Sequence, residues 1–217
     1  QEILAIFNAG GDGKCSNAPP AEIPPTIVTQ PESMRVNEGD TVLLSVLAQG
    51  SPPLTYQWFR NDTLIAGATN ASLALDPVAF DDAGTYYATV SNAFGIATSS
   101  NAVLSVNRVP IADASGTRTV FVLPPCTNSV RAVLNGTRSR DPDGDPLDYQ
   151  WLVAVTNLPV ATSRVAVVCL PLGQHAFDLV VNDGMAAATD RVEVLVITPR
   201  EALARLIASV RQSDWEK

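Results

Sequence analysis

An acidic run in the second half of the chain is the strongest candidate for metal chemistry. Asp141-Pro142-Asp143-Gly144-Asp145 places three carboxylates in one short turn, where a hard cation such as calcium would relieve their mutual repulsion. The spacing is not that of an EF-hand, because Gly stands at the fourth position and Leu152 stands where the bidentate Glu is required. The same residues also fit an ordinary tight turn closed by aspartate side-chain hydrogen bonds. The residues alone leave both interpretations open.

The other reactive residues do not indicate catalysis. His175 is the only histidine, and it precedes Phe177 in a predicted strand, which favours a structural side chain. One histidine, together with cysteines that are expected to pair, cannot build a catalytic triad or a zinc site. No Gly-rich phosphate loop is present. We therefore predict that the chain is not an enzyme.

The three cysteines are Cys15, Cys126 and Cys169. The number is odd and two of them fall within one predicted domain, so we predict a Cys126–Cys169 disulfide and one unpaired thiol. Such a bridge would be typical of an oxidising, secreted setting. Buried free thiols are the alternative.

The charge of the chain restricts its partners. A net charge of −8 argues against nucleic acid as a ligand and against attraction to anionic lipids. No apolar run approaches the roughly 20 residues needed to span a bilayer, so we expect no direct membrane insertion. The chain starts at Gln1 without Met, which indicates a processed or excised piece. We predict a secreted or cell-surface location.

A repeated motif predicts the architecture. Pro53-Leu54-Thr55-Tyr56-Gln57-Trp58 returns as Pro146-Leu147-Asp148-Tyr149-Gln150-Trp151, and each copy places a Trp within an alternating strand. A period of roughly 100 residues is the size of one sandwich in which a Trp fills the space between two sheets. The predicted fold class is all-β: two tandem immunoglobulin-like β-sandwiches with a short N-terminal segment and a C-terminal amphipathic helix. The predicted core centres on Trp58, Tyr86 and Trp151.

The first repeat resembles the I-set immunoglobulin family over residues 26–107. The residues that carry the resemblance are Trp58, Leu73, Asp82, Gly84 and Tyr86, with Asp82-x-Gly84-x-Tyr86 matching the family's tyrosine corner. The two bridging cysteines of that family fall on Val46 and Ala88 here, so the resemblance implies a domain without the inter-sheet disulfide. Its stability must then come from packing around Trp58.

The second repeat, residues 108–197, resembles the polycystic-kidney-disease (PKD) type of immunoglobulin-like domain. The resemblance rests on the acidic run, on Tyr149-x-Trp151, on Leu172-Gly173-x-His175 and on Val181-x-Asp183-Gly184. Some domains of that type bind calcium through the acidic loop together with residues that match Asn107 and Asp183. The resemblance therefore implies a calcium ion on Asp141, Asp143, Asp145, Asp183 and Asn107, and no other cofactor.

The two ends of the chain read as separate segments. Residues 1–15 resemble the last turn and closing Cys of laminin-G-like domains of large secreted bacterial proteins, with a disordered leader as the alternative. Residues 16–25 form a Pro-rich linker of the semi-rigid kind. Thr198-Pro199-Arg200-Glu201 is a capping box that opens a helix over residues 198–217, which has one apolar stripe. We predict contacts for self-association at Ile3, Phe7, Leu203, Leu206 and Ile207.

Two functions fit these features. The first is a non-catalytic extracellular segment that spaces or assembles a cell-surface or fibre protein through protein contacts. The alternative is an accessory glycan- or protein-binding region of a secreted hydrolase. An aromatic platform that binds glycan would favour the alternative, and the candidates for it are Phe59, Tyr87, Phe94 and Trp215.

Overall fold

The computed structural model describes residues 22–121 and 129–213, and it excludes the side chains of 206–207 and 209–213. The predicted segment 1–15, most of the linker 16–25, Cys15, Cys126 and Trp215 lie outside these residues. The chain divides into two compact units, made of Gln1–Met34, Leu43–Leu75 and Gly84–Leu104, and of Arg35–Val42, Asp76–Ala83 and Ser105–Lys217.

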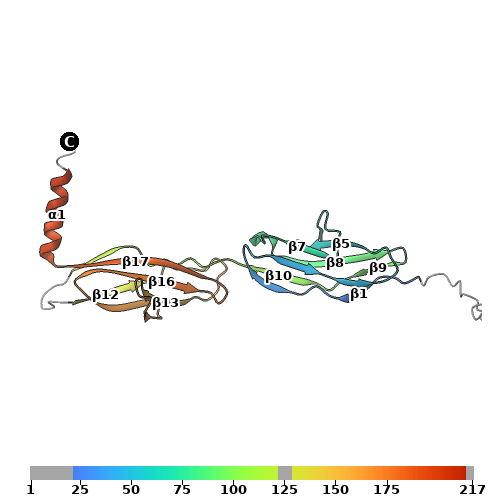
Figure 1. Cartoon of the computed structure of the whole chain (residues 1–217), viewed down its shortest axis with the longest axis horizontal. Coiled ribbons are helices and arrows are strands. Elements are labelled where there is room, and N and C mark those ends of the chain that lie inside the picture. The colour runs from blue at the N-terminus through green and yellow to red at the C-terminus, as the bar shows by residue number, and fades with distance from the viewer. Residues whose placement is uncertain (1–21, 122–128, 214–217) are drawn as a thin grey trace, which may run out of the picture. The chain divides into compact units, whose positions relative to one another are not determined.

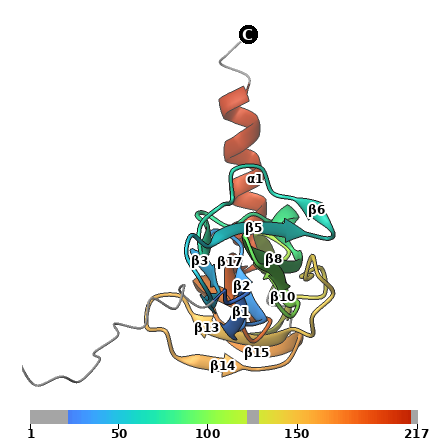
Figure 2. The same ribbon diagram turned by 90° about the vertical axis from the view of Figure 1, so that its right-hand side faces the viewer.

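The first sandwich contains three sheets (Figure 1). The largest has the order β2-β10-β8-β5-β6, with β9 paired to β8, and the others are the pairs β1-β4 and β3-β7. Figure 2 shows the β5–β6 hairpin at the end of the large sheet. The strands are β1 (Thr26–Thr29), β2 (Met34–Asn37), β3 (Val42–Ser45), β4 (Leu47–Gln49), β5 (Thr55–Arg60), β6 (Thr63–Leu64), β7 (Ser72–Leu75), β8 (Gly84–Asn92), β9 (Gly95–Thr98) and β10 (Ala102–Asn107).

The second sandwich contains a five-stranded sheet and a two-stranded sheet, with the orders β11-β17-β16-β13-β14 and β12-β15. The β11–β17 pair is parallel, and the pairs β13–β14, β13–β16, β16–β17 and β12–β15 are antiparallel. The strands are β11 (Arg118–Phe121), β12 (Ser129–Asn135), β13 (Asp148–Val153), β14 (Pro159–Ala161), β15 (Val165–Pro171), β16 (Gly173–Asn182) and β17 (Ala187–Ile197). The prediction of an all-β chain with tandem immunoglobulin-like sandwiches is confirmed.

A Trp occupies the core of each sandwich. Trp58 on β5 and Trp151 on β13 both have an exposed fraction of 0%. The indole Nε1 of Trp58 donates to the carbonyl of Asn70 at 3.0 Å, and that of Trp151 donates to the carbonyl of Ser163 at 3.2 Å. A buried indole needs such a partner, because an unsatisfied N–H costs about 1–3 kcal/mol. Each ring therefore buries apolar surface, and its hydrogen bond holds the segment that carries the accepting carbonyl against the core.

Alternation along the strands supplies the rest of each core. In β8, Tyr86, Ala88 and Val90 are buried and their neighbours are partly exposed, the period-two pattern of a strand with one face inward. Val46 and Ala88, where the I-set family has cysteines, are both buried and fill that space as apolar side chains. The second core is built in the same way around Trp151, from Ala132, Leu134, Phe177, Leu179, Val181, Val192 and Val194.

The helix α1 (Pro199–Ser213) follows β17. The predicted capping box is confirmed, since the Thr198 N–H donates to Glu201 Oε2 at 2.8 Å and the Glu201 N–H donates to Thr198 Oγ1 at 3.3 Å. Within the described part of the chain, no helix is both long and apolar enough to cross a membrane. Two short strands, β2 and β14, do not follow from the sequence pattern, because short strands carry little alternation.

Candidate functional site

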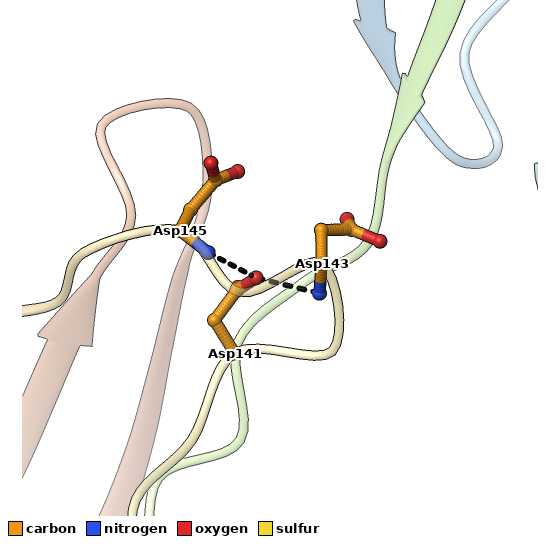
Figure 3. A group of neighbouring side chains, drawn as sticks. All are labelled: Asp141, Asp143 and Asp145. Atoms are coloured by element: carbon orange, nitrogen blue, oxygen red, sulfur yellow. Dashed lines mark hydrogen bonds between the residues drawn. The ribbon is translucent and has the colours of Figure 1, made fainter.

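The acidic loop lies between β12 and β13 and contains the carboxylates expected to hold a metal. One oxygen from each of Asp141, Asp143 and Asp145 lies within 4.8 Å of the others. Among the described residues, these three form the one group of side chains found that could hold a metal ion. Asp141 Oδ1 accepts hydrogen bonds from the N–H groups of Asp143 at 2.7 Å and Asp145 at 3.1 Å (Figure 3). Gly144 has a φ of 85°, a backbone conformation that glycine adopts without strain. The loop is therefore a tight turn closed by an aspartate side chain.

Arginines neutralise two of the three carboxylates. Asp143 accepts from the backbone N–H of Arg108 at 2.7 Å and from its Nε at 2.8 Å. The hydrogen bond from the Arg108 backbone, with that from its guanidinium, outweighs the effect of burial and holds the pKa of Asp143 below its usual value. Asp145 forms an ion pair with Arg35. A cation at this loop would have to compete with both guanidinium groups.

The third carboxylate retains an unused oxygen. Asp141 Oδ2 is buried and has no hydrogen-bond partner in the structure. Because a buried carboxylate oxygen without a partner is costly, it is the atom of the loop at which a cation would be most stabilising.

The two remaining predicted ligands contact each other. Asn107, which is fully buried, donates from Nδ2 to Asp183 Oδ2 at 3.0 Å. The Asn107 Oδ1, which a cation would need, accepts from Arg35 Nη2 at 2.8 Å. Burial raises the pKa of Asp183, but hydrogen bonds from Ala186, Asn107 and Met185 outweigh it, so that the pKa lies below the usual value. Arg35 thus links Asn107 to Asp145, and no pattern in the sequence predicts this contact.

The predicted aromatic residues do not all occupy one place. Phe59 on β5 and Tyr87 on β8 are stacked, with ring centroids 5.0 Å apart and planes at 8°. Tyr87 also lines a polar cleft of about 300 Å³ together with Asn61, Asp62, Thr85 and Asn101. Phe94 is 42% exposed in the turn between β8 and β9.

The described part of the second sandwich contains one histidine, His175, and one cysteine, Cys169. His175 Nε2 lies 2.9 Å from the carbonyl oxygen of Pro171. Cys169 is exposed, and the Cys126–Cys169 disulfide stays a prediction because Cys126 lies outside the described residues. Beside them lies an apolar cleft of about 480 Å³, lined by Val153, Val155, Val160, Val168, Cys169, Leu170, Gln174, His175, Ala176 and Phe177.

The residues predicted to mediate assembly are only partly described. Leu203 on α1 is 58% exposed. Leu206 and Ile207 lie in α1, but their side chains are outside the described set, as are Ile3 and Phe7. Contacts of these residues stay a prediction.

The immunoglobulin-domain family model matches residues 24–92. The chain is built of immunoglobulin-like domains. It is 34% identical over 136 residues to the basement membrane-specific heparan sulfate proteoglycan core protein of Mus musculus, a match of 57% of this chain and 4% of that protein. Similarity to human Kin of IRRE-like protein 3 is 25% over 146 residues, 67% of this chain and 18% of that protein. The decoration protein of Escherichia phage T5 is 38% identical over 78 residues, 35% of this chain and 46% of that protein.

Among solved structures, the I67–I69 fragment of the titin I-band superposes with a TM-score of 0.59 at 19% identity. The match covers 82% of this chain and 68% of the titin fragment, and at that identity it shows the fold alone. This chain spans only small parts of the mouse and human relatives, 4% and 18% of their lengths.

Proposed function

We propose that this chain is a non-catalytic extracellular segment that acts through protein contacts, spacing or assembling the larger protein of which it is a part. The supporting observation is the pair of sandwiches, each packed around a buried Trp whose indole N–H is bonded to backbone. Such cores supply rigid surfaces, and the acidic loop is the one group of three metal-ligating side chains found among the described residues. The basement-membrane proteoglycan is a relative that, by its name, works outside the cell.

The test is a binding experiment with a matched unfolded control. The chain is coupled to beads and exposed to surface-protein extracts, in parallel with beads that carry the Trp58→Ala, Trp151→Ala double variant. We expect saturable retention of protein by the folded chain and none by the variant. Equal retention of protein by the folded chain and by the variant would overturn the proposal. So would hydrolysis of any substrate in a broad panel by the folded chain but not by the double variant.

We further propose that the second sandwich is a PKD-like domain whose acidic loop holds calcium. The unpartnered Asp141 Oδ2 supports this, and Asp141, Asp143 and Asp145 would hold the ion, with Asn107 and Asp183 nearby in the predicted ligand set. The ion would add positive charge to the loop and cross-link its carboxylates.

Thermal unfolding with and without calcium, in chelator-treated buffer, tests the calcium proposal. A ligand that binds only the folded state raises Tm with concentration. We expect a calcium-dependent rise that Asp141→Asn removes and Asp178→Asn, which alters an aspartate paired with Arg191, leaves unchanged. Equal Tm values with calcium and with chelator would sink the idea.

An accessory glycan-binding role is the second candidate, and the cleft at Tyr87 favours it. An aromatic ring beside the polar side chains of Asn61, Asp62 and Asn101 offers both a stacking face and hydrogen-bonding groups for a sugar. Affinity electrophoresis in polysaccharide gels should show retardation that Tyr87→Ala removes and Phe94→Ala retains. Unretarded migration in every polysaccharide would exclude this role.

A further inference from the structure

The strand β15 leaves one backbone edge without a neighbour. Among the described strands it pairs with β12 alone, in an antiparallel register that runs from Asn135 opposite Val165 to Ser129 opposite Pro171. Its sequence, Val-Ala-Val-Val-Cys-Leu-Pro, contains no charged residue. Natural proteins usually protect such an edge with charge, an early Pro, a bulge or a short strand.

The register shows which backbone groups face this edge. The next pair beyond Asn135 and Val165 is Gly136 and Arg164, and the Gly136 N–H donates to the Arg164 carbonyl at 2.9 Å. Hydrogen-bonded and non-hydrogen-bonded pairs alternate in an antiparallel ladder. The even-numbered residues of β15 therefore bond to β12, and Val165, Val167 and Cys169 direct their N–H and C=O groups away from it.

Side chains cover the ends of the edge but not its centre. Ser163 Oγ donates to the Val165 carbonyl at 2.7 Å, and His175 Nε2 contacts the Pro171 carbonyl at 2.9 Å. The opposite edge, on β12, is covered in a similar way, by Arg118 on the Val133 carbonyl and Ser115 on the Asn135 carbonyl. On β15, no described group bonds to the backbone of Val167 or Cys169 on the open side.

The stretch of chain that contains this edge is mostly apolar and has no acidic residue. No Asp or Glu occurs between Asp148 and Asp178, although the chain carries a net charge of −8. The side chains of Val165 and Val167 are 43% and 52% exposed on the outer face of the sheet, next to Val133 on β12, which is 47% exposed. The apolar cleft of about 480 Å³ lies along the same strand.

We propose that β15 pairs edge to edge with β15 of a second copy of this chain, antiparallel and about a two-fold axis at Val167. In that register Val167 faces its own counterpart and Val165 faces Cys169 of the second copy, so the open N–H and C=O groups satisfy each other. Pro171, which has no N–H and whose carbonyl is already bonded, falls outside the paired region.

A second copy fits this edge because of charge and symmetry. Two chains of net charge −8 repel each other, and residues 149–177, which contain β15, add no negative charge to that repulsion. Identical antiparallel strands close a two-fold contact and leave no further edge to propagate. The inference goes beyond the proposed function, because binding of other proteins by the chain does not depend on it.

Sedimentation equilibrium of the whole chain over a wide concentration range, with reductant present, is the test. We expect a reversible monomer–dimer equilibrium that Val167→Lys weakens at least tenfold, because the two lysines would face each other directly across the two-fold axis. Val133→Lys is the matched control, with similar exposure on the same face but on the protected strand, and it should change the dimer constant by less than threefold.

Hydrogen exchange of the unaltered chain gives a second measurement that needs no variant. The amides of Val167 and Cys169 should exchange more slowly at high protein concentration, whereas those of Val130 and Ala132, on β12, should not change. A monomer at every concentration would overturn the proposal. So would a dimer that survives Val167→Lys, or one lost on deletion of residues 199–217, which would place the contact at the C-terminal helix.

Discussion

The two sandwiches fill their cores in the same way but differ at their sheet edges. In both, a Trp at the same place in the repeated motif is fully buried and donates its indole N–H to a backbone carbonyl twelve residues further on. In the first sandwich the strands of the two small sheets and the outermost strands of the large sheet are short: β1, β2, β3 and β7 have four residues each, β4 three and β6 two. In the second, β12 and β15 have seven residues each.

The comparison shows that the residues that stabilise the core of a sandwich are distinct from the outer strands whose backbone is open to another chain. Core packing depends on inward-facing residues, which both repeats supply by alternation. Short outer strands offer few unpaired backbone groups, whereas β15 offers a longer uncharged run. Two domains with equivalent cores can therefore differ in their tendency to pair with another chain.

The largest effect is expected from truncation of the Trp residues. Trp58→Ala and Trp151→Ala should each lower the free energy of unfolding of their own sandwich by about 3–5 kcal/mol, because each opens a large cavity and removes a buried indole. Denaturant unfolding followed by far-UV circular dichroism measures this, with the fluorescence of the Trp in the unaltered sandwich as the reference. A loss below about 1 kcal/mol in either sandwich would break the equivalence of the two cores.

A glycine pair tests packing at smaller scale. A Cβ on Gly136 would lie 2.8 Å from Leu179 Cδ2 in the core and 3.2 Å from the Arg164 carbonyl oxygen. A Cβ on Gly84 would meet the side-chain amide of Asn61 at 2.8 Å. We expect Gly136→Ala to cost about 1–3 kcal/mol. Gly84→Ala should cost a similar amount, because Gly84 has a φ of 159°, which residues with a side chain rarely adopt, and because Asn61 Oδ1 accepts from the Thr85 N–H at 2.9 Å.

The Gly136 effect has an internal control. If overpacking against Leu179 is the cause, Leu179→Val removes the clashing methyl group and the double variant should lose less than the sum of the two single losses. A double-mutant cycle by thermal unfolding measures this coupling. Strict additivity would show that the Arg164 carbonyl, not the core, opposes the added methyl group.

A smaller effect is expected from acid. Because the pKa values of Asp143 and Asp183 are lowered in the folded chain, their ionised forms stabilise the fold. That contribution is complete above the unfolded value of about 3.9 and is lost as the pH falls through the lowered folded values. The stability of the second sandwich should therefore decline below about pH 4.

Urea unfolding between neutral pH and pH 3, followed in the Trp58→Phe variant so that Trp151 dominates the signal, checks the acid effect. An Asp143→Asn, Asp183→Asn variant should show a flatter decline. An unchanged pH dependence in that variant would assign the acid sensitivity to other carboxylates.

The repeated Trp, the alternation that makes both sandwiches and the capping box that starts α1 could all be predicted from the amino-acid sequence, because these features depend on neighbours a few residues apart. The sequence also grouped the three aspartates of the acidic loop. The calcium ion and the Cys126–Cys169 bridge stay predictions. The three-dimensional structure was needed to find that Arg108 and Arg35 neutralise Asp143 and Asp145, and that β15 has one open edge among the described strands. Ion-pair partners and strand neighbours are set by packing between segments far apart in the chain, and no local pattern encodes them.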